Sequence, residues 1–138
     1  MANCLILGAS RGIGRELARQ YAAAGDRVIA TVRRTADASA LRDAGAARVV
    51  EVDLAQSSAV EILQAALADE PLDVAIIAAG VSGPVTTGLA APTAAEFDAV
   101  MHANVYPAMQ VIPLLAYKLA ATHGKLALLS SRMVLAAA

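Results

Sequence analysis

The chain has few aromatic residues and a single cysteine. Its 138 residues include no tryptophan, one phenylalanine and three tyrosines, and Cys4 is the only thiol. One thiol cannot form an intramolecular disulfide, which argues against a disulfide-stapled secreted domain and favours a reducing compartment. We therefore predict a cytoplasmic protein. Cys4 lies in an apolar run and is expected to be a small buried hydrophobe rather than a reactive group.

Neither sign of charge dominates the chain. Eleven Lys and Arg residues stand against twelve Asp and Glu residues, which gives a formal net charge of −1. This balance argues against a strongly basic surface that binds nucleic acid or acidic membranes, so we expect neither partner. The two histidines, His102 and His123, lie far in sequence from any cluster of Cys, Asp or Glu. We predict no metal site, and structural or surface roles for both side chains.

Long unbroken apolar runs are also missing, although 58% of the residues are hydrophobic. Residues 74–95 contain no charge but are interrupted by glycines and prolines, and residues 99–117 are interrupted by Asn104, Pro107 and Pro113. Because a membrane-spanning helix needs about 20 consecutive apolar residues, both stretches are interpreted as interior segments. No secretory signal is expected at the start of the sequence. The chain is predicted to form a single domain, residues 1–138.

Short β-rich runs alternate with longer segments of helical periodicity. The pattern predicts strands at 3–7, 27–32, 48–52, 73–79 and 126–129, and helices at 12–24, 36–44 and 57–69. A capping box at Thr93 and Glu96 opens a last long helix that runs towards Ala121 and bends near Pro107 and Pro113. Such alternation predicts an α/β fold with a Rossmann-type, doubly wound parallel sheet of about five strands.

The most informative segment joins the first strand to the first helix. It reads Gly8-Ala9-Ser10-Arg11-Gly12-Ile13-Gly14. Gly8 permits a tight turn, Gly12 lets the backbone approach a pyrophosphate, and Gly14 lets the helix pack closely on the strand. Backbone N–H groups and the helix dipole then favour an anion at this point. The alternative is a glycine-rich turn that binds no ligand.

The end of the second strand indicates which dinucleotide would bind. NAD-binding folds usually place Asp or Glu there for the ribose 2′-hydroxyl, whereas this chain has Arg33 and Arg34. A guanidinium at this place attracts the additional 2′-phosphate of NADP, and Arg11 lies close enough in the loop to contact the same group. We therefore expect NADP rather than NAD. The alternative for each arginine is a solvated surface charge.

Taken together, these segments resemble the short-chain dehydrogenase/reductase family, most closely its C-factor-like subgroup. The glycine loop resembles the family's cofactor loop, Asp53-Leu54 resembles the segment that meets the adenine ring, and Ala79-Gly80 resembles the end of an Asn-Asn-Ala-Gly motif. The cofactor-binding residues that the resemblance implies are Gly8, Ser10, Arg11, Gly12, Ile13, Gly14, Arg33, Asp53, Leu54, Ala79 and Gly80.

The resemblance also implies two catalytic residues. Ser131 matches the serine that orients the substrate oxygen, and Asn104 matches the asparagine that holds a water in the proton relay. Asn104 could equally be a buried side chain that ties its helix to the sheet. The implied reaction is hydride transfer between NADP(H) and a small carbonyl or alcohol compound.

The sequence departs from the family pattern at two places. Ile77 and Ala78 replace the two asparagines before Ala79-Gly80, which is expected to loosen the site modestly. More importantly, the family uses a tyrosine with a lysine four residues later, and here the three tyrosines are followed at that spacing by Gly25, Gln110 and Ala121. The lysine is needed because the pKa of an unperturbed tyrosine is near 10 and must be lowered towards the working pH for acid–base catalysis. We expect weak or no turnover, and hypothesise that a longer gene product was cut before this pair.

Three functional hypotheses remain open at this point. The first is the cofactor-binding part of an NADP-dependent oxidoreductase. The second is a non-catalytic nucleotide-binding or signalling module, because the cofactor loop is complete while the catalytic set is not. The third is an inactive fragment, since a sheet that stops at its fifth strand exposes unpaired backbone groups and invites dimerisation or aggregation. A homo-oligomer is therefore also among the expected partners.

Overall fold

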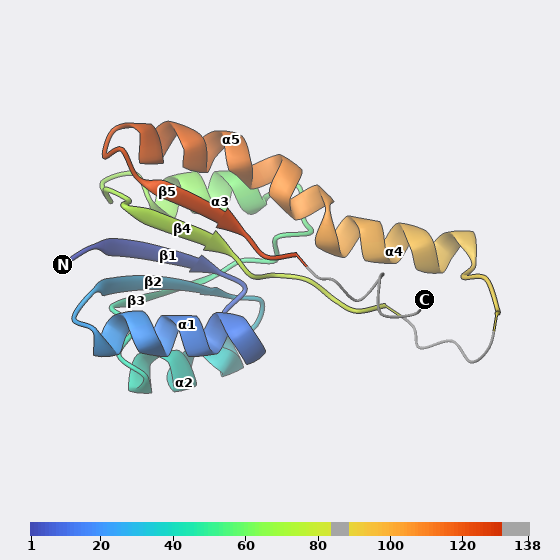
Figure 1. Cartoon of the computed structure of the whole chain (residues 1–138), viewed down its shortest axis with the longest axis horizontal. Coiled ribbons are helices and arrows are strands. Elements are labelled where there is room, and N and C mark those ends of the chain that lie inside the picture. The colour runs from blue at the N-terminus through green and yellow to red at the C-terminus, as the bar shows by residue number, and fades with distance from the viewer. Residues whose placement is uncertain (84–88, 131–138) are drawn as a thin grey trace.

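Five parallel strands and the helices between them make up the fold (Figure 1). The computed structural model describes residues 1–83 and 89–130. The strands are β1 (Asn3–Leu7), β2 (Arg27–Val32), β3 (Arg48–Glu51), β4 (Val74–Ile77) and β5 (Lys125–Leu128). The helices are α1 (Gly12–Ala23), α2 (Ala38–Asp43), α3 (Ala59–Ala66), α4 (Ala94–Asn104) and α5 (Tyr106–Ala120), with a 3₁₀ turn η1 (Thr35–Asp37) before α2.

The strands are ordered β3-β2-β1-β4-β5 across the sheet, and every neighbouring pair is parallel. The chain winds from β1 outward to β3 and then returns to the other side of β1 with β4. In open α/β sheets, ligands bind at the carboxyl ends of the strands where the winding direction reverses. The predicted doubly wound parallel sheet is confirmed, and its reversal lies between β1 and β4.

Helices cover both faces of the sheet. In Figure 1, α1 and α2 lie on one side and α3 and α5 on the other. Alternate residues of β1 serve the two layers: Leu5 and Leu7 pack in the cluster that contains Leu63 and Leu115, whereas Ile6 packs with α1 and α2. All five side chains are fully buried. The central strands are therefore apolar on both faces, as parallel strands between two helical layers must be.

The last helical segment is two helices rather than one bent helix. Val105 lies between α4 and α5, with φ −107° and ψ −48°. Pro107 follows in the first turn of α5, where it lacks the N–H that would continue the hydrogen-bond ladder of α4. Pro113 lies within α5 without ending it. The bend predicted near Pro107 is thus a break, while the predicted capping box is confirmed: Thr93 accepts from the Glu96 amide at 3.1 Å and Glu96 accepts from the Thr93 amide at 2.7 Å.

Two other predicted helices are shorter than expected. The helix predicted at 36–44 is divided between η1 and α2. The helix predicted at 57–69 begins only at Ala59, because the preceding residues form turns in which the Gln56 amide donates to the Asp53 carbonyl at 3.0 Å. These turns leave Asp53 and its neighbours in a loop at the carboxyl end of β3.

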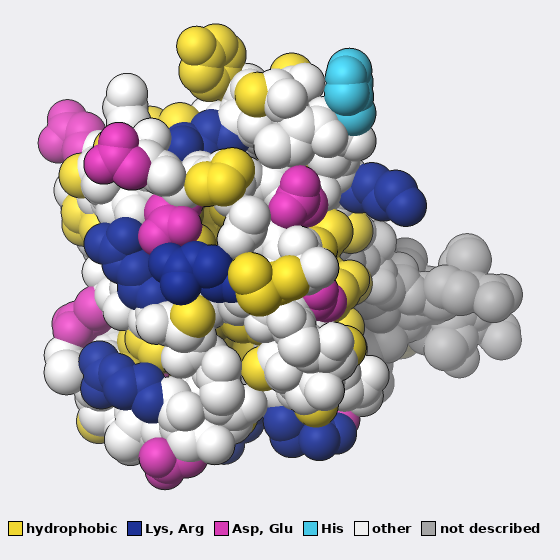
Figure 2. Space-filling model, turned by 90° about the vertical axis from the view of Figure 1, so that its left-hand side faces the viewer, with side chains coloured by type: hydrophobic (Ala, Val, Ile, Leu, Met, Phe, Trp, Pro, Cys, Tyr) yellow, Lys and Arg dark blue, Asp and Glu magenta, His cyan; other side chains and the backbone are white. Residues whose placement is uncertain are grey.

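Charged side chains tie the elements together at the amino ends of the strands. Glu70, just after α3, accepts a hydrogen bond from Arg27 of β2 at 2.7 Å, and its carboxylate lies 3.9 Å from Arg48 of β3. Lys118 of α5 donates to the main-chain carbonyl of Glu70 at 3.1 Å. Figure 2 shows this face, where basic and acidic side chains lie next to one another.

Cys4 lies in the core, as the sequence predicts. Cys4 is fully buried in β1, and burial raises the pKa of its thiol to about 11, so it is a core side chain rather than a nucleophile.

The prediction that residues 74–95 and 99–117 are interior is right only in part: most of β4 and one side of α5 are buried, but residues 89–95 are exposed and α4 has no buried residue. No helix in the described residues is long and apolar enough to cross a lipid bilayer.

Candidate functional site

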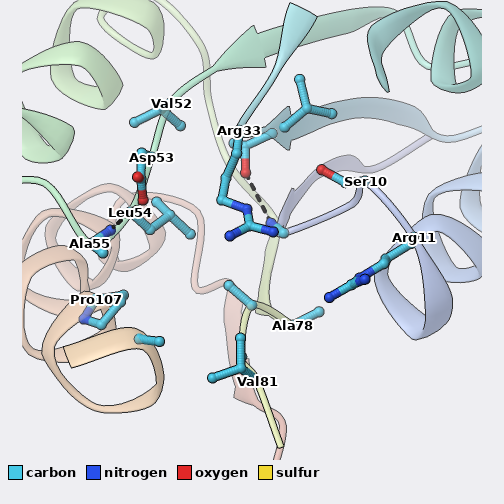
Figure 3. A pocket seen from close by; sticks show the side chains of 16 residues that line it. Ser10, Arg11, Arg33, Val52, Asp53, Leu54, Ala55, Ala78, Val81 and Pro107 are labelled. Carbon is cyan, nitrogen blue, oxygen red and sulfur yellow. Dashed lines mark hydrogen bonds between the residues drawn. The ribbon is translucent and has the colours of Figure 1, made fainter. Parts of the chain in front are cut away.

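A pocket opens at the carboxyl ends of the strands, where the winding of the sheet reverses (Figure 3). Its wall comes from the turn after β1, the end of β2, the loops after β3 and β4, and the helices α4 and α5. Predicted cofactor residues from segments far apart in the sequence therefore meet in one place. Those that line the pocket are Gly8, Ser10, Arg11, Arg33, Asp53, Leu54, Ala79 and Gly80.

The turn after β1 depends on glycine at two positions of close backbone approach. Gly8 has φ +84°, and a Cβ on it would lie 2.6 Å from the backbone of Ala79 in the loop after β4. A Cβ on Gly14 would overlap the carbonyl oxygen of Gly8. Glycine at these positions brings α1 against the turn and the turn against β4.

Gly12 is a glycine for a different reason. It has φ +59°, and a Cβ built on it would meet no heavy atom of the described residues within 4 Å. The backbone at Gly12 thus faces open space rather than a packed neighbour. Bare backbone beside open space is what a bulky anionic group needs in order to approach the main chain.

The first turn of α1 has free hydrogen-bond donors. Among the described residues, the amides of Gly12, Ile13 and Gly14 have no acceptor. The N-cap residue Arg11 has an extended backbone and makes no capping bond, and the first turn contains no acidic side chain. Gly8 and Ala9 differ, because their amides already donate to Thr31. The donors available to an anion are therefore those of the helix start.

Two arginines from separate loops border the same space. In Figure 3 Arg33 extends from the end of β2 and Arg11 points in from the start of α1. Both are exposed, and neither forms an ion pair within the described part of the chain. Arg34 differs, since its guanidinium lies 3.4 Å from the Asp37 carboxylate and its side chain is 78% exposed. Arg11 and Arg33 together give this end of the pocket a positive charge.

The loop after β3 forms the opposite wall and is held from both sides. Asp53 accepts a hydrogen bond from the Ala55 amide at 3.0 Å, which folds the loop on itself. From α5, the Gln110 amide group donates to the Leu54 carbonyl at 3.2 Å and to the Gln56 carbonyl at 3.1 Å. His102 of α4 lies 2.9 Å from the Ala55 carbonyl through Nε2. The long helices therefore set the position of Asp53 and Leu54.

Asn104 connects the end of α4 to the loop after β4. Its Oδ1 accepts from the Val81 amide at 2.6 Å and its Nδ2 donates to the Val81 carbonyl at 2.7 Å. Gly80 leaves room for this side chain, because a Cβ there would lie 3.1 Å from the Asn104 oxygen and Asn104 would have to shift slightly. Asn104 therefore ties α4 to the loop after β4, but its side chain is half-buried and does not bond to the sheet itself, so the buried tie considered from the sequence is met only in part.

Some predicted residues lie outside the pocket wall or outside the described part. Gly12, Ile13 and Gly14 are not among the residues that line it, although they directly follow Arg11, which does. Ile77 is buried in β4 and Ala78 lines the pocket, so the positions of the replaced asparagines lie at the site. Ser131 lies outside the residues that the structure describes.

Sequence reasoning missed three residues that shape the site. Thr31 bonds to the glycine turn, and His102 and Gln110 hold the loop that contains Asp53. None of the three belongs to a recognisable motif. Only Thr31 gave a signal, because it is a polar residue inside an otherwise apolar strand.

Comparison with known proteins identifies the family. The model of the short chain dehydrogenase family matches residues 2–136. No curated protein matches the chain.

Solved structures of several family members are similar to this fold. A carbonyl reductase from Pseudomonas aeruginosa in complex with NADP has a TM-score of 0.85 and 30% sequence identity, over 96% of this chain and 60% of that one. A short-chain dehydrogenase/reductase from Burkholderia multivorans with bound NADP has a TM-score of 0.83 and 28% identity, over 94% and 58%. A short chain dehydrogenase from Shigella flexneri has a TM-score of 0.83 and 27% identity, over 94% and 55%.

These values also give the extent of the match. The chain covers less than two thirds of the length of each of these three proteins. With its sheet order, its glycine turn and the match along nearly its whole length, the chain belongs to the short-chain dehydrogenase family.

Proposed function

We propose that the chain binds NADP(H) at the carboxyl end of its sheet. The observation that supports this most strongly is that, among the described residues, the amides of Gly12 and Ile13 have no acceptor and directly follow Arg11, which lines the pocket together with Arg33, and neither arginine has an ion-pair partner there. Main-chain donors at a helix start suit a pyrophosphate, and a pair of guanidinium groups suits the 2′-phosphate. The NADP complexes of the relatives from P. aeruginosa and B. multivorans support the same choice.

The shape of the loop fits such a cofactor. The backbone at Gly12 faces open space, whereas Gly8 and Gly14 allow contacts that any larger residue would prevent. On this proposal Asp53 and Leu54 contact the adenine ring, and Ala79 and Gly80 border the nicotinamide half. Ser10 stands between the two halves, at the turn.

The proposed chemistry is that of the family, in which bound NADP(H) exchanges a hydride with a carbonyl or alcohol carbon. Asn104 positions the loop after β4 through its two bonds to Val81. Ser131 is proposed to orient the substrate oxygen, and Asn104 is also proposed to take part in the proton relay. The 138 residues contain no tyrosine followed four positions later by lysine. We therefore propose weak or no turnover by this chain in a cytoplasmic setting, and rapid NADPH oxidation with any member of a carbonyl panel would contradict this.

A second candidate is a non-catalytic nucleotide-binding or signalling module. It is favoured by the contrast between a complete cofactor loop and the missing Tyr-Lys pair. Both candidates require NADPH binding. Slow but measurable NADPH oxidation would favour the first, NADPH binding with no turnover would favour the second, and no binding of any dinucleotide would leave only an inactive fragment.

The double variant Arg11→Ala/Arg33→Ala tests the choice of cofactor. Removing both guanidinium groups should weaken NADPH binding by roughly 1–3 kcal/mol per charged contact, and leave NADH binding nearly unchanged. Fluorescence titration of each reduced cofactor gives both dissociation constants. Arg34→Ala is the matched control, because Arg34 is a neighbouring cation whose side chain pairs with Asp37. Equal losses for NADPH and NADH, or the same loss in the control, would refute the proposed 2′-phosphate site.

A further inference from the structure

Thr31 is an exception in the core of this protein. Within residues 1–83 and 89–130 it is the one polar side chain classed as buried, with 1% of its surface exposed, and it lies in the otherwise apolar end of β2. Burying a hydroxyl group is unfavourable unless the group is hydrogen-bonded. A valine would fill the same space and favours strands. Packing alone therefore does not explain why this position has a hydroxyl group.

The explanation lies in what the hydroxyl contacts. Thr31 Oγ1 accepts a hydrogen bond from the Gly8 amide at 2.9 Å, and the Thr31 carbonyl accepts from the Ala9 amide at 2.9 Å. The regular pairing of β1 with β2 reaches only as far as Ile6 and Ala30. Thr31 thus binds the first two residues of the glycine turn, one through its side chain and one through its main chain.

The conformation of Gly8, held by Thr31, in turn affects the start of α1. Its φ of +84° directs the chain away from the sheet, and its carbonyl oxygen is in close contact with Gly14 in the first turn of α1. The free amides of Gly12 and Ile13 lie between these two glycines. Their direction therefore depends on the two peptides that flank Gly8. The Thr31 hydroxyl holds the peptide before Gly8 through the Gly8 amide, and the Thr31 carbonyl holds the peptide after it through the Ala9 amide.

We propose that Thr31 is a positioning residue for the pyrophosphate of the cofactor. Its hydroxyl holds the Gly8 amide so that the donors at Gly12 and Ile13 point into the pocket. This inference rests on the proposed function, in which the same loop binds NADP(H). Thr31 also lines the pocket, but the proposed role acts through Gly8 and needs no direct contact with the ligand.

The variants Thr31→Val and Thr31→Ser distinguish the effect of the hydroxyl on the loop from the effect of the side chain on core packing. Valine keeps the shape and removes the acceptor, whereas serine keeps the acceptor and removes a methyl group. Two ligands are titrated into the full chain: NADPH, which contains a pyrophosphate, and adenosine 2′-monophosphate, which does not. The midpoint of thermal unfolding is measured for each variant.

The expected result is selective for the ligand. Thr31→Val should weaken NADPH binding about tenfold, the effect of losing one well-placed hydrogen bond, and change adenosine 2′-monophosphate binding by less than about twofold. Thr31→Ser should bind both ligands as the wild type does. If the valine variant does not fold, Thr31→Ala compared with Thr31→Ser isolates the hydroxyl in the same way.

Two results would overturn the inference and leave the proposed function standing. One is unchanged NADPH binding in Thr31→Val, and the other is an equal loss for both ligands that follows the change in thermal stability. If the wild-type chain does not bind NADPH, whether or not it binds adenosine 2′-monophosphate, the proposed function is wrong and this inference fails with it.

Discussion

At the scale of single residues, the three glycines of the turn have different physical reasons to be glycine. Gly8 and Gly14 are small because backbone lies against them, and Gly12 is small although nothing lies against it. A larger residue at Gly8 or Gly14 would disturb the fold itself. At Gly12 a larger residue would occupy the space that the proposed ligand needs. A substitution there therefore tests ligand binding with less effect on folding than one at Gly8 or Gly14.

Gly12→Ala is predicted to reduce NADPH binding more than it reduces stability. An alanine at φ +59° costs roughly 1–2 kcal/mol of conformational strain, and its Cβ projects into otherwise open space. NADPH affinity should fall roughly tenfold to a hundredfold, because the pyrophosphate can no longer approach the amides. Calorimetric titration and thermal unfolding measure the two effects.

Gly25→Ala is the matched control for this variant. Gly25 has φ +89° and no atom within 4 Å of a built Cβ, so alanine suffers comparable strain there. It lies at the other end of α1, away from the pocket. A similar loss of NADPH affinity in both variants would show that strain, and not blocked access, explains the result at Gly12.

At the scale of elements, side chains couple strands to helices at both ends of the sheet. At the carboxyl end, Gln110, His102 and Asn104 connect α4 and α5 to the loops of the pocket. At the amino end, Glu70 connects the loop after α3 to β2 and β3. The hydrogen bonds from Arg27 hold the pKa of Glu70 below its ordinary value of 4.5, against the opposing effect of burial.

Glu70→Gln is predicted to destabilise the protein by about 1 kcal/mol at neutral pH. The value is modest because the Arg27 side chain is 36% exposed, so solvent screens the pair. Since the folded pKa of Glu70 is lowered, its contribution is complete above about pH 4.5 and is lost as the pH falls through the folded pKa. Denaturant unfolding at pH 7 and pH 3 should therefore show a difference between variant and wild type that shrinks in acid.

The control for this prediction is Glu16→Gln, which removes the exposed pair with Arg19 on the surface of α1. Its effect at pH 7 should be smaller than that of Glu70→Gln. A gap between Glu70→Gln and wild type that stays constant or widens on acidification would contradict the assigned role of Glu70.

The elements show how far the sequence predicts this structure. The strands and the first helix were predictable within a residue or two, because their apolar pattern and flanking glycines are local signals. The start of α3 and the break at Val105 were not, since both depend on turns and missing hydrogen bonds that the periodicity does not contain. Likewise the glycine turn was readable as a motif, whereas the bonds of Thr31 to Gly8 and of Gln110 to Leu54 join residues 23 and 56 positions apart.

At the scale of the whole molecule, the two edges of the sheet differ. On the β3 edge, Arg48 and Glu51 place exposed charges of both signs, a common protection against strand pairing. On the β5 edge, Leu126, Leu128 and Leu129 are 38%, 52% and 41% exposed. This asymmetry is consistent with the predicted homo-oligomer, which remains a prediction.

The two ends of the sheet differ as well. The amino end is held together by the paired charges around Glu70. At the carboxyl end, the amides of the helix start and the guanidinium groups of Arg11 and Arg33 have no partner among the residues that the structure describes. Binding of a dinucleotide should therefore change the environment of residues at the carboxyl end of the sheet and not at the amino end.

The most direct test of the account is a map of main-chain amide chemical shifts in the ¹⁵N-labelled chain during titration with NADP⁺. The account predicts saturable shifts at Gly12, Ile13 and Gly14, with none around Glu70 and Lys118 at the far end. Adenosine 2′-monophosphate should shift the amides around Arg33 and Arg11, and should shift those of Ile13 and Gly14 much less than NADP⁺ does. Saturation with NADP⁺ that leaves the amides of Gly12 and Ile13 unmoved would contradict the claim that this helix start binds the cofactor's pyrophosphate.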